Sequence, residues 1–280
     1  MTGVAGQGDE LLSVRDLRVV FPGTRAEEAA VKGISFGMRT GQTLGLVGES
    51  GSGKSTACLA IMGLLARGAA VSGSISFRGT ELVGAPESRI RRMRGKEIGL
   101  VYQDPMAALN PVKTIGAQLR EPLRLHQGLS RRQADERAVE LLSRVGIEQP
   151  QDKLTSFPHE FSGGMRQRVV IAMAISCNPT LLIADEPTTA LDVSVQAQVL
   201  GLLSDLTADL GIGLLIVSHD LSVVAGLADD VAVMRHGEVV EYGPVRQVFE
   251  RPEHPYTRDL LAVVRELEDD PVPVTGPLPS

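Results

Sequence analysis

Residues 48–55 carry the most distinctive chemical pattern in this sequence. They read GESGSGKS, which fits the phosphate-binding pattern G-x-x-x-x-G-K-[ST]. Such glycines let backbone N–H groups surround phosphate oxygens, while Lys54 can reach the β- and γ-phosphates and the Ser55 hydroxyl can ligate Mg²⁺. The alternative is a glycine-rich turn that binds nothing, but a strand pattern precedes the segment and a helical pattern follows it. The residues expected to bind a nucleotide are Gly48, Glu49, Ser50, Gly51, Ser52, Gly53, Lys54, Ser55 and Thr56.

A pair of carboxylates follows a second apolar run. Residues 181–187 read LLIADEP, so Asp185 and Glu186 stand where a strand should end. Beside bound phosphates, Asp185 can hold Mg²⁺ directly or through water, and Glu186 can orient and deprotonate an attacking water. Acids in this position often only cap a helix. Combined with the phosphate-binding pattern, however, the pair predicts a nucleotide hydrolase.

Composition limits the other classes of function. The 280 residues include 28 Lys and Arg against 34 Asp and Glu, a net charge of −6, which argues against nucleic acid as a general partner. Two cysteines, Cys58 and Cys177, cannot make a disulfide framework or a four-cysteine zinc site, and they fit a reducing compartment. The first residues do not resemble a signal peptide, and no apolar run approaches the roughly 18 residues of a membrane span.

Short β-rich runs alternate with helical patterns, which predicts an α/β fold with a largely parallel sheet. Ser130 and Gln133 indicate a capping box for a helix over residues 130–145, which Gly146 ends, and a second apolar helix face ends at Gly211. The expected buried strands are residues 44–47, 98–102, 181–184, 214–217 and 231–234, with a hairpin closed by 238–241.

These patterns also suggest how the chain is divided. We expect an ATPase core, an inserted helical subdomain, a short C-terminal segment and two disordered ends. The corresponding ranges are 11–87 with 162–245 for the core, 88–161 for the helical subdomain, 246–265 for the C-terminal segment, and 1–10 and 266–280 for the ends.

Residues 161–168, which read FSGGMRQR, resemble the signature motif of ATP-binding cassette (ABC) ATPases. Other hallmarks occur in the order of that family: Gln103 in VYQDP resembles the Q-loop, Ala190 to Asp192 the D-loop, and His219 in IVSHD the switch histidine. The resemblance spans about residues 11–262. It implies an α/β P-loop NTPase of the ABC type, with a mixed, mostly parallel sheet core and an inserted helical subdomain. It also implies ATP and Mg²⁺ as cofactors.

The resemblance assigns roles to these positions. Glu186, His219 and Gln103 would be catalytic, and Mg²⁺ would be held by Ser55, Gln103 and Asp185. Ser162 begins a helix, and Gly163 and Gly164 leave its first amides open to an anion. In this family the signature, here Ser162, Gly163, Gly164 and Met165, faces the ATP site of a second cassette, with D-loop Asp192 nearby.

Few aromatic side chains are available to stack on adenine, because the chain has only three Tyr and six Phe and no Trp. Phe21 lies 27 residues before Gly48, after the strand-like residues 17–20, and it resembles the stacking aromatic of the family. A role in the core is the alternative for Phe21.

Several phrases resemble the oligopeptide, dipeptide and nickel importer branch of the family, above all VFERPEHPYT at residues 248–257. This likeness implies a second ATPase subunit, expected to be a paralogue, two transmembrane permease subunits and an extracytoplasmic substrate-binding protein. It also implies that this chain lies at the cytoplasmic face of the cell membrane. Peptide import is the leading expectation. Many members continue into a cysteine-rich tail, but no cysteine follows Cys177. We therefore expect no iron–sulfur cluster in this chain, and a nickel or metal-chelate importer stays open as the alternative.

Two other classes of function were weighed against transport. A non-transport ABC ATPase acting on DNA or ribosomes usually carries a coiled coil, tandem cassettes or basic patches, which this sequence lacks. A regulatory module without turnover is disfavoured because Lys54, Asp185, Glu186 and His219 are all present.

Overall fold

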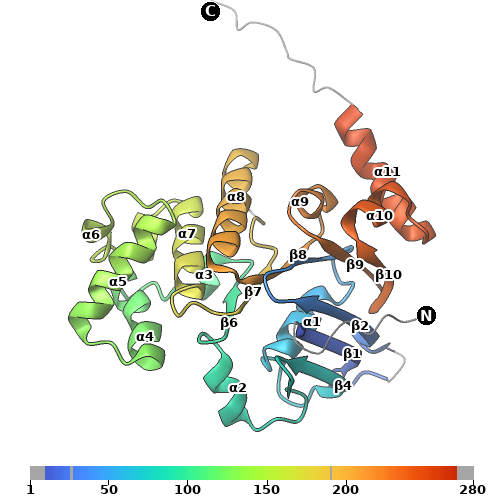
Figure 1. Ribbon diagram of the computed structural model, residues 1–280, viewed down its shortest axis with the longest axis horizontal. Coiled ribbons are helices and arrows are strands. Elements are labelled where there is room, and N and C mark those ends of the chain that lie inside the picture. Colours follow the sequence, from blue (N-terminus) through green and yellow to red (C-terminus); the bar gives the residue numbers. More distant parts are fainter. Residues whose placement is uncertain (1–9, 26–27, 190, 270–280) are drawn as a thin grey trace, which may run out of the picture.

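Two β-sheets and a group of helices build the protein (Figure 1). The structure is a computed structural model that describes residues 10–25, 28–189 and 191–269. The larger sheet has the strand order β10-β9-β3-β8-β7-β6, in which β10 is antiparallel to β9 and the other neighbours are parallel. Its strands are β3 (Thr43–Val47), β6 (Ile98–Val101), β7 (Leu181–Asp185), β8 (Gly213–Ser218), β9 (Asp230–Arg235) and β10 (Glu238–Pro244). The expected strands and hairpin are therefore confirmed.

The smaller sheet is antiparallel and has the strand order β2-β1-β4-β5. Its strands are β1 (Glu10–Val20), β2 (Val31–Arg39), β4 (Ala70–Phe77) and β5 (Thr80–Glu81). Side chains of this sheet share one core with helix α1 (Lys54–Ile61) and with one face of the larger sheet. Leu44 and Leu46 of β3 point into that core, whereas Val47 points into the core on the opposite face. Burial on both faces explains why these strands read as continuous apolar runs.

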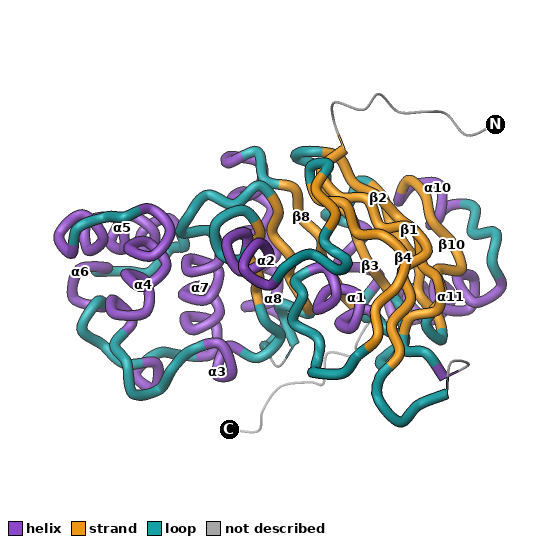
Figure 2. The backbone as a smooth tube through the Cα atoms, turned by 90° about the horizontal axis from the view of Figure 1, so that it is seen from below, coloured by secondary structure: helices purple, strands orange, loops and turns teal. Residues whose placement is uncertain are grey.

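A separate group of helices lies beside the sheets. Figure 2 shows α3 to α7 at one end of the molecule and the strands of both sheets at the other. These helices are α3 (Pro105–Ala108), α4 (Ile115–Gln127), α5 (Arg131–Arg144), α6 (Pro150–Lys153) and α7 (Gly163–Ala174), with a short 3₁₀ turn at Pro158–Glu160 before α7. Helix α2 (Glu87–Met93) leads into β6.

The helical insertion differs in extent from the expected range 88–161. That range contains β6, which pairs with β7 inside the larger sheet, and it leaves out α7, which packs on α4 and α5. The strand predicted at residues 98–102 falls inside that range, and strand order, which local patterns do not reveal, joins it to the larger sheet as β6. Helix α7 packs both on β6 and on the helices α4 and α5, so it belongs to the helical group as well as to the sheet.

Two helix ends match the sequence pattern. Ser130 and Gln133 form both hydrogen bonds of a capping box at the start of α5, and Gly146 follows with a φ of 73°. Helix α8 (Val193–Leu210) ends at Gly211, whose φ is 63°. Both predicted helices are therefore confirmed.

The C-terminal part adds α9 (Leu221–Ala225), α10 (Val245–Glu250) and α11 (Pro255–Asp269). Disorder was expected at residue 10 and at residues 266–269. In the structure, Glu10 belongs to β1 and residues 266–269 form the end of α11, so these positions have regular secondary structure. Residues 1–9 and 270–280, and Ala190 of the expected D-loop, lie outside the described residues. Within the described part of the chain, none of the helices combines the length and apolarity needed to cross a membrane.

Candidate functional site

The candidate site lies at one edge of the larger sheet. Strands β3, β8, β7 and β6 are neighbours and run parallel, so their carboxyl ends meet along that edge. The phosphate-binding loop follows β3, His219 follows β8, Asp185 ends β7 and Gln103 lies two residues beyond β6. Open parallel sheets characteristically bind ligands at the carboxyl ends of their strands. The topology therefore brings together motifs that are up to 171 positions apart between Gly48 and His219.

Two glycines let the phosphate-binding loop lie against neighbouring backbone. Gly48 has a φ of 151°, and a Cβ there would stand 2.1 Å from the carbonyl oxygen of Met234. Gly53 has a φ of 104°, and its Cβ would stand 2.5 Å from the carbonyl oxygen of Ala30. Gly53 also opens α1, whose first amides have no helical partner. A side chain at either position would force the loop out of this shape.

Lys54 is buried inside the loop. Its ammonium donates hydrogen bonds to the carbonyl oxygens of Gly48 (2.7 Å) and Glu49 (2.9 Å). Burial lowers the pKa of Lys54, and the nearby carboxylates of Glu186 and Asp185 oppose that shift. A cavity of about 220 Å³ opens over the loop and is lined by Ala30, Ser50, Gly51, Gly53, Lys54, Ser55, Thr56, Gln103 and Glu186.

Ser55 and Asp185 form a pair of oxygen donors beside that cavity. The Ser55 hydroxyl donates to Oδ1 of Asp185 at 3.0 Å, although 130 positions separate the two residues. Burial raises the pKa of Asp185, and the hydrogen bond from Ser55 acts in the opposite direction. A hydroxyl and a carboxylate are hard oxygen ligands of the kind that Mg²⁺ takes next to phosphates. These two residues therefore fit the expected metal.

Glu186 is surrounded by three side chains. Its Oε2 accepts hydrogen bonds from Gln103 Nε2 (3.1 Å) and Thr189 Oγ1 (3.0 Å), and His219 Nδ1 lies 3.3 Å away. The Glu186 side chain is 14% exposed, and its backbone φ is 46°, a left-handed conformation that is uncommon for glutamate. Gln103 and His219, the other two expected catalytic residues, thus both lie next to Glu186, and the additional contact from Thr189 was not anticipated from the sequence.

The signature residues stand at the start of α7, away from the cavity. The Ser162 hydroxyl accepts from the backbone N–H of Met165 at 3.3 Å, and Ser162 and Gly163 are exposed. A Cβ on Gly164 would come within 2.6 Å of Cγ1 of Val195, so this glycine permits close packing of α7 on α8. Asp192 caps α8 by accepting from the N–H of Val195 and the hydroxyl of Ser194, and these hydrogen bonds lower its pKa.

Phe21 follows the last residue of β1 and is half-buried. It packs against the core that lies beneath the smaller sheet. It is not among the residues that line the cavity over the phosphate-binding loop. The stacking role expected for Phe21 stays a prediction beside its contribution to the core.

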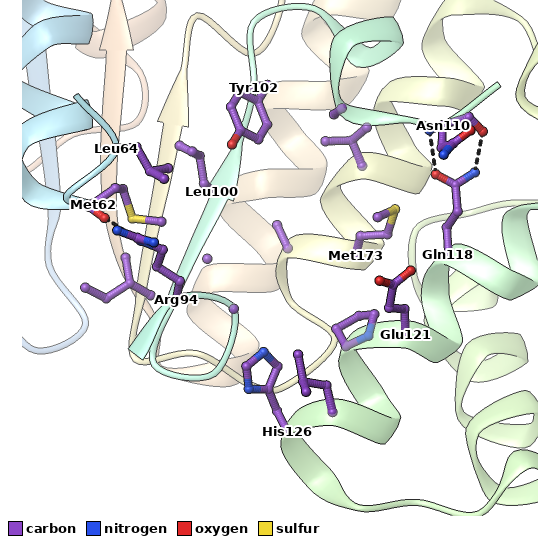
Figure 3. Close-up of a pocket in the computed structure, with 18 of the residues that line it drawn as sticks. Met62, Leu64, Arg94, Leu100, Tyr102, Asn110, Gln118, Glu121, His126 and Met173 are labelled. Carbon is purple, nitrogen blue, oxygen red and sulfur yellow. Dashed lines mark hydrogen bonds between the residues drawn. The ribbon is translucent and has the colours of Figure 1, made fainter. Parts of the chain in front are cut away.

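A second cavity, of about 510 Å³, lies between the sheet core and the helical group (Figure 3). Met62 and Leu64 approach it from the end of α1, whereas Met173 and Leu125 approach it from helices α7 and α4. Tyr102 also lines this cavity, and the next residue, Gln103, donates a hydrogen bond to Glu186. Local sequence patterns could not predict this groove, because its lining comes from four separate segments.

One contact with the phosphate-binding loop comes from the C-terminal segment. The hydroxyl of Tyr256, in α11, accepts a hydrogen bond from the backbone N–H of Glu49 at 3.1 Å. Tyr256 is 4% exposed, and 207 positions separate it from Glu49. Nothing in local spacing could have predicted this pairing.

A phosphate-binding loop between a strand and a helix, with a carboxylate pair at the end of a neighbouring parallel strand, defines a P-loop nucleoside triphosphatase. The comparisons refine that class. The family model described as "ABC transporter" matches residues 31–189. The oligopeptide transport ATP-binding protein OppD of Escherichia coli K12 is 48% identical over 262 residues, covering 94% of this chain and 78% of that protein. The chain belongs to the ABC transporter ATP-binding family, and its activity is ATP hydrolysis.

Solved structures agree with this assignment. The structure of cbiO1 from Clostridium perfringens, described as part of the ABC transporter complex cbiONQ, superposes with a TM-score of 0.75 at 28% identity, covering 94% of this chain and all of that one. A dimeric post-hydrolysis state of the ATP-binding cassette MJ0796, bound to ADP and Pi, gives a TM-score of 0.73 at 26% identity, covering 84% of this chain and 99% of that one. The expected α/β ABC-type fold is therefore confirmed.

Proposed function

We propose that this chain is the ATP-hydrolysing subunit of an importer that takes up oligopeptides or dipeptides through a membrane permease. The observation that carries the proposal is the convergence of Lys54, Asp185, Glu186 and His219 on one sheet edge, in a chain that is 48% identical to an oligopeptide transport ATP-binding protein. The first part supports turnover of ATP, and the second supports the kind of cargo.

In the proposed reaction, Lys54 and the loop amides hold the β- and γ-phosphates, and Glu186 accepts a proton from the attacking water. His219 and Gln103 contact the same carboxylate, so both can orient Glu186 toward that water. Ser55, Asp185 and Gln103 would hold Mg²⁺, which neutralises developing charge on the phosphates when it is bound. Phe21 is proposed to stack on adenine at the outer end of the site.

The functional unit is proposed to contain two cassettes. Ser162 begins α7 with exposed amides, and it does not line the cavity that contains Lys54 of the same chain. A helix N-terminus attracts anions, so the γ-phosphate held by a second cassette is a suitable partner for Ser162, Gly163 and Gly164. The dimeric MJ0796 cassette supports such an arrangement. We propose a paralogue as the second cassette.

The groove of Figure 3 is proposed to receive the permease. Leu64 and Tyr102 are exposed by 36% and 41% at its margin, and Leu125 by 74%, which is unusual for large apolar side chains on a soluble surface. Tyr102 and Gln103 are adjacent in sequence, so a segment docked against Tyr102 would act directly on the residue that contacts Glu186. In the proposed complex, the chain lies at the cytoplasmic face of the membrane, together with two permease subunits and an extracytoplasmic binding protein.

The proposal is tested by uptake in the host cell. Deleting the gene should abolish uptake of a labelled tripeptide. Expression of the wild-type chain should restore it, whereas expression of the Glu186→Gln variant should not. Nickel uptake, measured in the same strains, checks the alternative metal cargo. Peptide uptake that persists after deletion while nickel uptake is lost would overturn the assignment of cargo but not that of the ATPase.

A further inference from the structure

The outer side of the phosphate-binding loop is held by the C-terminal part of the chain. Residues 252–258, which we call the C-terminal strap, lead from α10 into α11, and both helices lie beside β10 at the edge of the larger sheet (Figure 1). From this strap the Tyr256 hydroxyl accepts from the N–H of Glu49 at 3.1 Å. Glu49 is an exposed residue of the loop, whereas Tyr256 is buried. The strap therefore connects an exposed part of the loop to a buried side chain.

The strap itself is firmly fixed to the hairpin of β9 and β10. Both carboxylate oxygens of Glu241, on β10, accept backbone N–H groups of the strap, from Glu253 at 2.9 Å and from His254 at 3.1 Å. Nδ1 of His254 accepts from the N–H of Tyr256 at 3.2 Å. The guanidinium of Arg235, at the end of β9, lies 4.6 Å from the centre of the Tyr256 ring. These contacts leave the tyrosine ring little freedom.

The hydrogen bond of Tyr256 gains importance when phosphate is bound. An ammonium has three N–H donors, and Lys54 uses two of them on the carbonyl oxygens of Gly48 and Glu49. Contact with both the β- and γ-phosphates needs two donors, so at least one bond from Lys54 to the loop must weaken. The segment Gly48–Glu49 then keeps fewer hydrogen bonds from Lys54 to its carbonyl oxygens. The hydrogen bond from the N–H of Glu49 to Tyr256 does not involve Lys54, so phosphate binding does not draw it away.

We propose that Tyr256 is a positioning residue for the ATP site, through which the C-terminal strap keeps the phosphate-binding loop in its nucleotide-binding shape. Its effect is on nucleotide affinity, because a loop that must be ordered during binding lowers the apparent affinity. The inference rests on ATP binding by the loop and is independent of the cargo. Burial raises the pKa of Tyr256 above its ordinary value, and the hydrogen bond from the N–H of Glu49 opposes that shift.

The decisive variant is Tyr256→Phe in the full chain, which removes one oxygen and keeps the ring. We expect the dissociation constant of a non-hydrolysable ATP analogue to rise about 3- to 10-fold, the range that one hydrogen bond supplies. The KM for ATP should rise in parallel, while kcat at saturating ATP stays within about twofold. The amide of Glu49 should exchange with solvent faster than in wild type. The matched control is Tyr242→Phe, on the same strand as Glu241, which removes a hydroxyl that donates to the backbone oxygen of Gly37 in β2 instead of bonding to the phosphate-binding loop.

A second variant tests the route through the strap. Glu241→Gln lacks the charge that holds the N–H groups of Glu253 and His254, so it should weaken affinity in the same direction and by a smaller factor. Unchanged affinity in Tyr256→Phe, or an equal loss in Tyr242→Phe, would overturn the proposal. ATP binding by Lys54→Ala is measured in parallel and tests the ATP site itself. A failure of the Tyr256 proposal can therefore be told apart from a failure of the ATP-site assignment.

Discussion

At the scale of single residues, the surroundings of Glu186 suit a general base whose carboxylate must keep a fixed orientation. Within the described part of the chain, the side-chain hydrogen bonds that Glu186 accepts converge on Oε2, from Gln103 and Thr189, and His219 Nδ1 lies 3.3 Å from the same oxygen. Oε1 is the oxygen that remains for a water. The left-handed φ of 46° is maintained by the backbone N–H of Glu186, which donates to the Val217 oxygen of β8. Such local strain is typical of groups whose direction matters more than their stability.

Glu186→Gln should keep ATP affinity and lose turnover. The amide is nearly the same size and can still position water, but it cannot accept a proton, so the rate should fall about 10²- to 10⁴-fold. Affinity by calorimetry and phosphate release by a coupled assay separate the two effects. Glu140→Gln, at an exposed position on α5, is the control and should leave the rate unchanged. Turnover within threefold of wild type would remove Glu186 from the role of base.

Lys54→Ala should lose affinity for ATP itself. Lys54 is the side-chain cation buried within the loop, and its carbonyl contacts also stabilise the loop shape. Removing it takes away both the charge opposite the phosphates and an internal brace. Calorimetry with ATP on Lys54→Ala and on the exposed control Lys96→Ala checks this expectation. Equal affinity in the two variants would contradict the assignment of the loop.

At the scale of elements, two glycines in regular structure predict opposite effects on stability. A Cβ on Gly45, in β3, would stand 2.2 Å from Cγ1 of Val224 in α9, whereas a Cβ on Gly201, in α8, meets nothing within 4 Å. Gly45→Ala should lower the free energy of unfolding by about 1–3 kcal/mol through overpacking. Gly201→Ala should raise it by about 0.5–1 kcal/mol, because alanine favours the helix. Chemical denaturation of both variants measures the two shifts. A Gly45→Ala variant at least as stable as wild type would show that β3 does not pack on α9 this closely, and a destabilised Gly201→Ala variant would contradict the open position of Gly201.

The elements that could be predicted from the sequence are those with strong local patterns. The strands of the larger sheet are apolar on both faces, and α5 and α8 carry clear caps, so each is visible in a window of a few residues. The smaller sheet was not predicted as a whole. In β1 the alternation shifts between Val14 and Leu17, where Asp16 has a φ of 48°, so the two-residue period is lost.

The candidate site likewise has features that could be predicted from the sequence and features that could not. Its motifs could be read from type and spacing, because phosphate and metal chemistry demand particular residues at fixed intervals. Contacts such as Ser55 with Asp185, or Tyr256 with Glu49, join segments more than 100 positions apart and depend on strand order. The groove lined by Tyr102 and Leu125 likewise exists only once the helical group packs beside the sheets.

At the scale of the whole molecule, the two sets of residues that we propose to bind ATP lie in different parts of the chain. Lys54 belongs to the sheet core, while Ser162 belongs to the helical group. Gly164 packs on Val195, three residues after Asp192, so the signature residues and the start of α8 are in direct contact. In the proposed dimer, a partner cassette that contacts Asp192 would therefore press on the element that supports Ser162.

The last prediction concerns that closure. ATP should join two cassettes by lying between Lys54 of one and Ser162 of the other, because a helix N-terminus with exposed amides attracts the γ-phosphate, which ADP lacks. In the Glu186→Gln background, with the partner cassette present, Ser162→Arg should abolish ATP-dependent dimerisation in sizing experiments while each chain still binds nucleotide. The control Ser143→Arg, at an exposed position on α5, should dimerise as the unmodified chain does. Normal dimerisation of Ser162→Arg, or full ATPase activity of an isolated monomer that is independent of concentration, would show that the site is not shared.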